Sequence, residues 1–191
     1  MIGRMTAQRR FKAYRIHEEN RKIVARFESL TLDDLTAGEV VVRVTHSGIN
    51  YKDALAATGA GRILRRYPLV GGIDFAGIVE SSGDARYTAG DPVLVTGCGL
   101  SETVDGGYSE IARVSGDAVI SLPSGLDALG AMTIGTAGFT AALAIARAPK
   151  QARLLDRAHV ARRHARTPRP VAPGDRGVDA PFRASVLADE L

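Results

Sequence analysis

Short apolar runs separated by glycine turns constrain the fold of this chain more than any other feature. Residues 39–46 read EVVVRVTH, and β-branched side chains of this kind favour a strand. Residues 17–20 are polar and are expected to turn between the first two strands. Six further runs follow the same pattern, at residues 11–16, 22–27, 73–80, 93–96, 108–114 and 119–122. Seven short strands in quick succession predict a mainly β domain with some α, either a small barrel or a sandwich.

Two segments of the chain are expected to be helical. Residues 51–57 follow a glycine-containing turn and end at Gly59, a residue type that commonly terminates helices. Residues 126–147 place apolar side chains at close to helical spacing, but Gly135 and Gly138 interrupt the segment. We therefore expect two helices with a break between them.

The composition changes near residue 148. From there the chain is rich in Arg, Ala and Pro and has neither strand nor helix periodicity, so we expect a disordered tail. The expected organisation is an N-terminal extension, a catalytic domain, linking helices and a tail, at residues 1–10, 11–125, 126–150 and 151–191.

Charge and cysteine content argue against several classes of protein. Residues 1–150 carry 17 Lys+Arg and 16 Asp+Glu, so most of the excess positive charge lies in the tail. Cys98 is the single cysteine, and alone it forms neither an internal disulfide nor a zinc site. We expect no apolar run long enough to span a bilayer and no signal peptide. The prediction is a cytoplasmic protein that binds neither membranes nor nucleic acid, with nucleic-acid binding by the tail as a rival.

Five motifs in consistent order resemble one family. The first, at residues 47–56, reads SGINYKDALA. The others read YPLVGGIDFAG, AGDPVLVTG, GGYSE and IGTAGFTA, at residues 67–77, 89–97, 106–110 and 134–141. Together they resemble the zinc-free acryloyl-CoA reductases and quinone oxidoreductases of the medium-chain dehydrogenase/reductase superfamily. The resemblance implies a GroES-like β-barrel catalytic domain and a cytoplasmic, often dimeric, NADPH-dependent enzyme.

The same resemblance predicts that no metal is bound. In zinc alcohol dehydrogenases, the positions that match Asn50 and Ile73 hold cysteine and histidine ligands. Neither isoleucine nor an isolated asparagine is a useful Zn²⁺ ligand, and the four-cysteine lobe of those enzymes is absent from this sequence. Hydride transfer from NADPH is therefore expected to proceed without a Lewis acid.

The resemblance also nominates residues around the first expected helix. Tyr51 is expected to contact the nicotinamide half of NADPH, and its hydroxyl to act on the thioester as a hydrogen-bond or proton donor. Asn50, in the same turn, is the second catalytic candidate. The alternative is that Tyr51 only packs. Lys52 either balances phosphate or enolate charge in the substrate or is a solvated helix residue. Asp53 and Asp74 are expected to be supporting carboxylates.

Two further groups are candidates for ligand contact. Thr136 and Thr140 lie near the break between the expected helices, where they either bond the cofactor or pack helices together. Arg62, Arg65 and Arg66 follow the first helix and either meet the phosphates of a coenzyme A thioester or form a solvent-exposed loop. Arg66 is our candidate for substrate binding.

Relatives of this type continue with a Rossmann nucleotide-binding domain. No glycine-rich turn of that kind occurs between residues 148 and 191, so we expect the domain to be absent and the chain to be inactive alone. The short chain arises either from a frameshift or as a genuine product. The parent enzyme is expected to reduce the C=C bond of acryloyl-CoA, an enone or a quinone, with a homodimer as one expected assembly. The alternative is a non-catalytic GroES-like module that dimerises with a full-length relative.

Overall fold

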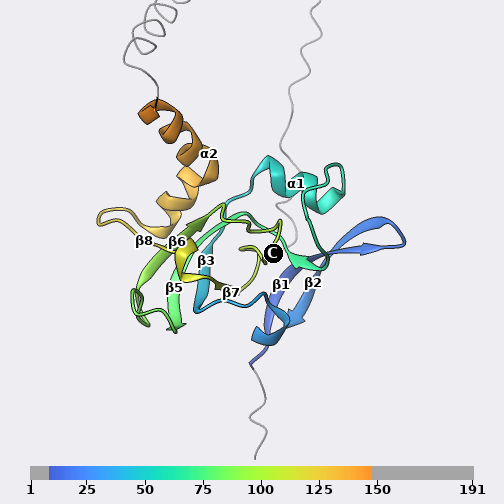
Figure 1. The fold of residues 1–191 in the computed structure, drawn as a ribbon, viewed down its shortest axis with the longest axis horizontal. Coiled ribbons are helices and arrows are strands. Elements are labelled where there is room, and N and C mark those ends of the chain that lie inside the picture. Colours follow the sequence, from blue (N-terminus) through green and yellow to red (C-terminus); the bar gives the residue numbers. More distant parts are fainter. Residues whose placement is uncertain (1–8, 148–191) are drawn as a thin grey trace, which may run out of the picture. The chain divides into compact units, whose positions relative to one another are not determined.

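The computed structural model describes residues 9–147, which form eight strands, two helices and two short 3-10 turns (Figure 1). This confirms the expected mainly β fold with some α. Residues 1–8 and 148–191, which include most of the expected N-terminal extension and the whole expected tail, lie outside the described residues. The 3-10 turns, η1 (Leu32–Asp34) and η2 (Gly116–Ala118), each precede or join strands.

A three-stranded antiparallel sheet has the order β2-β1-β4, with β1 at Phe11–Glu19, β2 at Lys22–Leu30 and β4 at Leu69–Val70. The turn between β1 and β2 lies at Asn20 and Arg21, whose φ angles are 52° and 64°. It was expected at residues 17–20. The strands extend further because polar side chains contact one another along the hairpin, His17 with Glu28 at 2.9 Å and Arg26 with Glu19 at 2.6 Å. β4 was not expected, since two residues carry no periodicity.

A five-stranded antiparallel sheet has the order β7-β3-β5-β6-β8. Its bounds are β3 Val40–His46, β5 Asp74–Ser82, β6 Pro92–Thr96, β7 Ile111–Val114 and β8 Ile120–Ser121. The segment before β7 links this sheet to the other one. Tyr14 donates its backbone N–H to the carbonyl of Tyr108 at 2.7 Å, and Ala13 forms an isolated bridge with Ser109. The two sheets are joined there, and within the described residues they do not close into a barrel.

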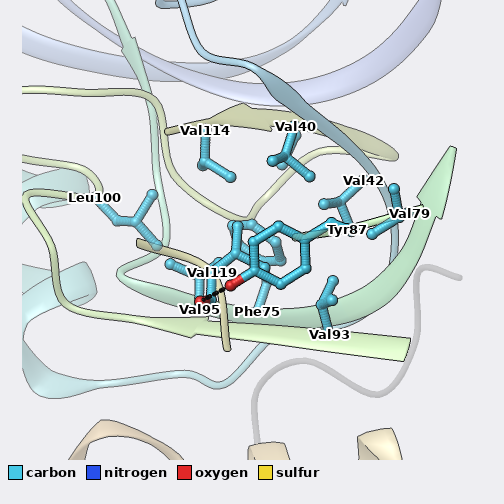
Figure 2. Close-up of a cluster of buried hydrophobic side chains, with 11 residues drawn as sticks. Val40, Val42, Phe75, Val79, Tyr87, Val93, Val95, Leu100, Val114 and Val119 are labelled. Carbon is cyan, nitrogen blue, oxygen red and sulfur yellow. Dashed lines mark hydrogen bonds between the residues drawn. The ribbon is translucent and has the colours of Figure 1, made fainter. Parts of the chain in front are cut away.

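The main hydrophobic core fills the inner face of the five-stranded sheet (Figure 2). Phe75 and Val95 are fully buried in it, as are Val40 and Val42 of the neighbouring strand β3. Tyr87 closes one side, and its hydroxyl donates to the carbonyl of Val119 at 2.5 Å. Because β5 runs through this core, the position of its first residue, Asp74, is held firmly.

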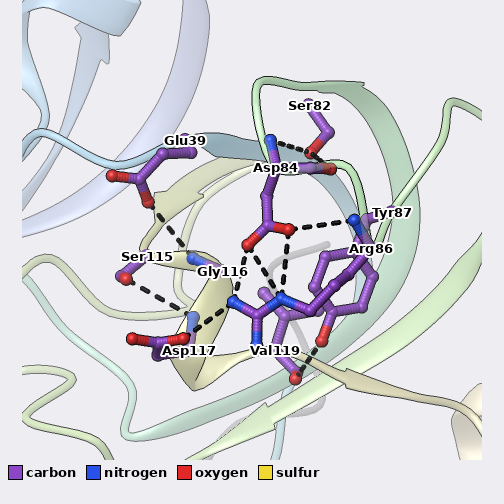
Figure 3. A network of polar contacts seen from close by, with 9 residues as sticks. All are labelled: Glu39, Ser82, Asp84, Arg86, Tyr87, Ser115, Gly116, Asp117 and Val119. Carbon is purple, nitrogen blue, oxygen red and sulfur yellow. Dashed lines mark hydrogen bonds and ion pairs between the residues drawn. The ribbon is translucent and has the colours of Figure 1, made fainter.

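An ion-pair network secures the loop between β5 and β6 (Figure 3). Arg86 donates to the carboxylate of Asp84 at 2.6 Å and to that of Asp117 at 2.7 Å. The Asp84 side chain also packs against Gly116, where an added Cβ would lie 1.9 Å from a carboxylate oxygen. The network therefore ties this loop to η2 and has a structural role.

The helix α1 (Tyr51–Thr58) lies between β3 and β4 and ends at Gly59, whose φ of 74° permits the left-handed cap. The second helix, α2 (Ala128–Arg147), contains the expected break. Gly135 has φ 53° and ψ −165°, so two helices meet across a kink. Both helical predictions are confirmed.

The whole of α2 is long and apolar enough to cross a membrane by length and composition, with a mean hydropathy of 1.6 and 11% of that window buried. The expectation that no such run exists is wrong on these two criteria. However, the backbone leaves the helical region at Gly135, and neither half reaches the roughly 20 residues that a spanning helix needs. A core helix of a globular protein passes the same two criteria, so they are weak evidence for a span.

Candidate functional site

Two segments that are distant from each other in sequence converge on the carboxylate of Asp74, which is 0% exposed at the start of β5. Its Oδ1 accepts the backbone N–H of Gly48 at 2.9 Å. Its Oδ2 accepts the side-chain amide of Asn50 at 3.0 Å. The same oxygen accepts the backbone N–H of Thr136 at 3.0 Å and the Thr136 hydroxyl at 2.8 Å. Asp74 thus connects the entrance to α1 with the break in α2.

The local backbone explains why a carboxylate is accommodated at this point. The kink at Gly135 starts a new helical segment, whose first N–H groups have no partner within the helix. Asp74 supplies an acceptor for one of them, and its negative charge suits the positive end of that segment. Gly48 has room only for hydrogen, because a Cβ there would lie 2.7 Å from the Asp74 carboxylate.

Asp53 caps α1 from inside the fold and is 4% exposed. Its carboxylate accepts the backbone N–H of Asn50 at 2.8 Å and that of Ile73 at 3.2 Å. Burial raises the pKa of Asp53 above its ordinary value, and the charge of Asp74 acts in the same direction. Two carboxylates therefore stand close together in a partly dry site, each held by donor groups.

Tyr108 lies against these carboxylates. Its hydroxyl donates to the carbonyl of Gly48 at 3.0 Å. Burial, followed by the charge of Asp53, raises the pKa of Tyr108 well above its usual value. The phenol therefore stays protonated at neutral pH and serves as a hydrogen-bond donor.

Tyr51 and Ile49 flank this polar cluster in sequence and point away from the domain interior, at 81% and 87% exposed. Within the described residues, the Tyr51 side chain is therefore exposed and not packed in the core. Lys52, the next residue, pairs with Glu102, which belongs to the turn after β6. The start of α1 thus carries an exposed aromatic ring beside a lysine that already has a partner.

The two candidate threonines occupy different settings. Thr136 is part-buried, and its hydroxyl lies 2.7 Å from that of Thr96 as well as close to Asp74. Thr140 is exposed and donates to the carbonyl of Thr136 at 2.8 Å, one turn earlier in the helix. The structure brings Thr136 together with Asn50 and Asp74, whereas Thr140 lies outside that hydrogen-bonded cluster.

Arg66 lies apart from this cluster. Its Nε donates to the carbonyl of Thr103 at 2.8 Å and its guanidinium to the hydroxyl of Thr36 at 2.6 Å. Thr36 in turn donates to the buried carboxylate of Asp105. The side chain of Arg66 is therefore engaged in holding two loops together, and its candidate role in substrate binding stays a prediction.

Comparison with known proteins identifies the family. The sequence profile of the alcohol dehydrogenase GroES-like domain matches residues 36–145. The chain belongs to this GroES-like family. The acrylyl-CoA reductase AcuI of Ruegeria pomeroyi is 51% identical over 128 residues, which is 67% of this chain and 39% of that protein. The expected resemblance to acryloyl-CoA reductases of the medium-chain superfamily is thereby confirmed.

Two solved structures of the GroES-like family place the match in three dimensions. Escherichia coli YhdH with bound NADPH is 49% identical, with a TM-score of 0.68, over 70% of this chain and 41% of that one. Bacillus subtilis yhfP with bound NAD is 41% identical, with a TM-score of 0.71, over 75% and 46%. The chain therefore spans about two fifths of the length of the relatives it matches.

Two residues near Asp74, Tyr108 and Thr96, were not predicted from the sequence. Tyr108 belongs to the GGYSE motif, so its place in the family pattern was the available signal. Thr96 gave no signal, because its partner Thr136 is 40 residues away. Between residues 9 and 147, no group of three or more His, Cys, Asp or Glu side chains is placed to hold a metal ion.

Proposed function

We propose that this chain supplies the GroES-like, acceptor-binding half of an NADPH-dependent reductase. The reaction would reduce the C=C bond of acryloyl-CoA or of a similar enone or quinone, without zinc. The observation that carries the proposal is the convergence of Asn50 and Thr136 on the buried Asp74, immediately beside the exposed Tyr51. We assign residues 11–125 to the catalytic domain and residues 126–150 to linking helices. The names of the relatives support this choice of reaction.

The described residues fit the nicotinamide end of the cofactor. Tyr51 offers an exposed ring that can lie against a flat heterocycle, and Thr140 has an exposed hydroxyl with acceptor capacity remaining. Thr136 would border the same end, although Asp74 and Thr96 already occupy its hydroxyl. When bound, NADPH supplies the hydride for the reaction.

The proposed roles of Tyr51, Asn50 and Lys52 follow from the place where negative charge develops on the acceptor. As the C=C bond is reduced, negative charge accumulates on the carbonyl oxygen, and a hydrogen bond placed there lowers the barrier. The Tyr51 hydroxyl would supply that bond or the proton for the α-carbon. Asn50 would act as a positioning residue, since its amide is engaged by Asp74. Lys52 would add positive charge at the rim, moderated by Glu102.

Two proteins test the proposal. One is the 191-residue chain, and the other is a fused enzyme in which residues 1–147 are joined to the nucleotide-binding remainder of E. coli YhdH. NADPH binding is followed by its fluorescence, and NADPH oxidation is followed after adding acryloyl-CoA. We expect the fused enzyme to bind NADPH and to turn over, and the 191-residue chain is measured beside it under the same conditions.

A fused enzyme that folds and binds NADPH but oxidises it with neither acryloyl-CoA, an enone nor a quinone would contradict the proposal. The matched control is the fused enzyme with Asp117→Asn, a change at an 87% exposed carboxylate in the loop network. This variant should retain full activity.

A non-catalytic role is the second candidate, and the surface of α2 favours it. Ile134 and Phe139 are 52% and 45% exposed, and they border a cavity of about 300 Å³ with Leu94 and Ile120. An exposed apolar surface of this kind is typical of protein contacts. If the chain is an interaction module, it should co-purify with a full-length relative, and Phe139→Ser should abolish this. Failure to co-purify would rule out the module.

A further inference from the structure

A cavity of about 660 Å³ lies at the far end of α1 from Tyr51. Arg21 of the β1–β2 turn lines it together with Arg62 and Arg65 of the loop after α1. Ile23 and the buried Leu64 supply apolar wall. A volume of this size lies within the range of small-molecule sites.

The two sides of this cavity, which we call the arginine cavity, are held together by close packing. A Cβ at Gly59 would lie 2.7 Å from the side chain of Ile23, so the end of α1 presses directly on β2. Gly59 also has a φ of 74°, which glycine adopts without strain. Close packing between the end of α1 and β2 therefore sets where the backbone of Arg21 lies relative to the loop after α1.

The three arginine side chains have no hydrogen bond or ion pair with any residue between 9 and 147. In the same part of the chain, Arg66 and Arg86 each donate to protein acceptors. Within the arginine cavity Glu18 is the only acidic residue, so the cavity carries a net positive charge. Unpaired guanidinium groups around a hollow are suited to an anionic ligand.

Phosphate is the anion that this arrangement suits best. A guanidinium donates two parallel hydrogen bonds to phosphate oxygens, and several arginines together match a ligand with more than one phosphate. Tyr67 adds an aromatic ring to the wall, which can lie against a purine. The chemistry is that of a nucleotide with several phosphate groups.

The distance between the arginine cavity and Tyr51 further restricts which ligands could reach both. Eight helical residues separate the start of α1 from Gly59, a length of about 12 Å at 1.5 Å per residue. A coenzyme A thioester carries its phosphates and its reactive acyl group at opposite ends of a pantetheine arm, which is longer than this when extended. One such molecule can therefore reach from the arginine cavity to Tyr51.

We propose that the arginine cavity binds the phosphoadenosine end of a coenzyme A thioester. The choice of thioester rests on the proposed function. Of the three arginines that the sequence suggested for phosphate contacts, the inference keeps Arg62 and Arg65, and it replaces Arg66 with Arg21. It predicts that acryloyl-CoA is preferred over an enone or quinone that lacks the nucleotide.

Calorimetric titration of the purified 191-residue chain with free coenzyme A tests the inference without requiring turnover. The probes for comparison are dephospho-coenzyme A, pantetheine, inorganic phosphate and NADPH. We expect coenzyme A to bind most tightly and pantetheine not to bind. Arg62→Gln and Arg65→Gln should each weaken coenzyme A binding about tenfold, the loss of one charge-assisted contact.

The matched control is Arg43→Gln, which removes an exposed arginine on β3 and should leave binding unchanged. Arg65→Lys keeps the charge but not the paired hydrogen bonds, and it should fall between wild type and Arg65→Gln. Equal binding of coenzyme A to wild type and to the Arg62→Gln/Arg65→Gln variant would overturn the inference. So would equal binding of inorganic phosphate, or tighter binding of NADPH to the same residues.

These outcomes are separable from failure of the proposed function. If the fused enzyme reduces an enone but neither protein binds coenzyme A, the proposed binding of coenzyme A by the arginine cavity is wrong and the proposed reductase function stands. Arginine-dependent coenzyme A binding without any reduction would support the cavity and count against the reductase.

Discussion

The carboxylate of Asp74 accepts two hydrogen bonds from Thr136, one from the backbone N–H at 3.0 Å and one from the hydroxyl at 2.8 Å. The two residues lie 62 positions apart in sequence. This contact fastens the break in α2 to the start of β5. It also leaves Asp74 as a buried anion whose partners are all donor groups of the protein.

Asp74→Asn should destabilise the domain by about 3 kcal/mol, because hydrogen bonds to a charged group are strong and an amide cannot accept at both positions. Thr136→Val should cost about 1 to 2 kcal/mol, since the backbone bond to Asp74 survives. Thr140→Val, at an exposed position, should have little effect. Urea unfolding of the three variants measures the loss of stability in each and so tests this order. Equal stability of Asp74→Asn and wild type would show that the carboxylate is not the connecting group.

The stability of the domain should depend on pH through Asp53, whose pKa is raised by burial. A raised carboxyl pKa means that the folded state binds more protons than the unfolded state above about pH 3.9, the ordinary value. The contribution of Asp53 to stability is therefore fully present below that pH and is lost as the pH rises through the folded pKa. The stability of wild type relative to Asp53→Asn should fall over this interval.

Asp34 provides a control of opposite sign. Its pKa is lowered, first by the backbone hydrogen bond from Thr31. The contribution of Asp34 is present above the ordinary carboxyl pKa and is lost as the pH falls through the lowered value. The unfolding free energy of wild type, Asp53→Asn and Asp34→Asn is measured between pH 3 and 7. The difference between wild type and Asp53→Asn should fall as the pH rises, whereas the difference between wild type and Asp34→Asn should rise. Parallel slopes would contradict the burial of Asp53.

Gly106 should tolerate no side chain. A Cβ at this position would lie 2.1 Å from the backbone oxygen of Gly72, close to the strand that delivers Asp74. Gly106→Ala should cost about 2 kcal/mol through overpacking against backbone. Gly83→Ala is the matched control, because the nearest atoms to its Cβ are at 3.8 Å. Thermal unfolding compares the two, and equal melting temperatures would contradict the close approach.

Local features of the fold were predictable from sequence. The strand at residues 40–46, the helix beginning at Tyr51 and the break at Gly135 each follow from residue types within a few positions. The capping role of Asp53 follows from its place in the first turn of α1. The turn of the β1–β2 hairpin was misplaced, because polar side chains in β1 that are typical of a turn contact partners on β2.

Contacts between distant segments were not predictable in the same way. Asp74 was expected to be a supporting carboxylate, but nothing near it in sequence indicates that Thr136 is its partner. The arginine cluster shows the same limit. Arg62 and Arg65 were recognised together with Arg66, whereas the fold separates Arg66 from them and brings in Arg21 from the hairpin. Tertiary packing decides these neighbours.

The proposed function assigns the Tyr51 hydroxyl to the acceptor, and this role is tested most directly by acryloyl-CoA-dependent NADPH oxidation by the fused enzyme carrying Tyr51→Phe. Loss of the hydroxyl should lower kcat by about 10²-fold with little change in stability, since Tyr51 is 81% exposed. Tyr14→Phe, which removes a hydroxyl from β1, should retain kcat. A Tyr51→Phe enzyme as fast as wild type would contradict the claim.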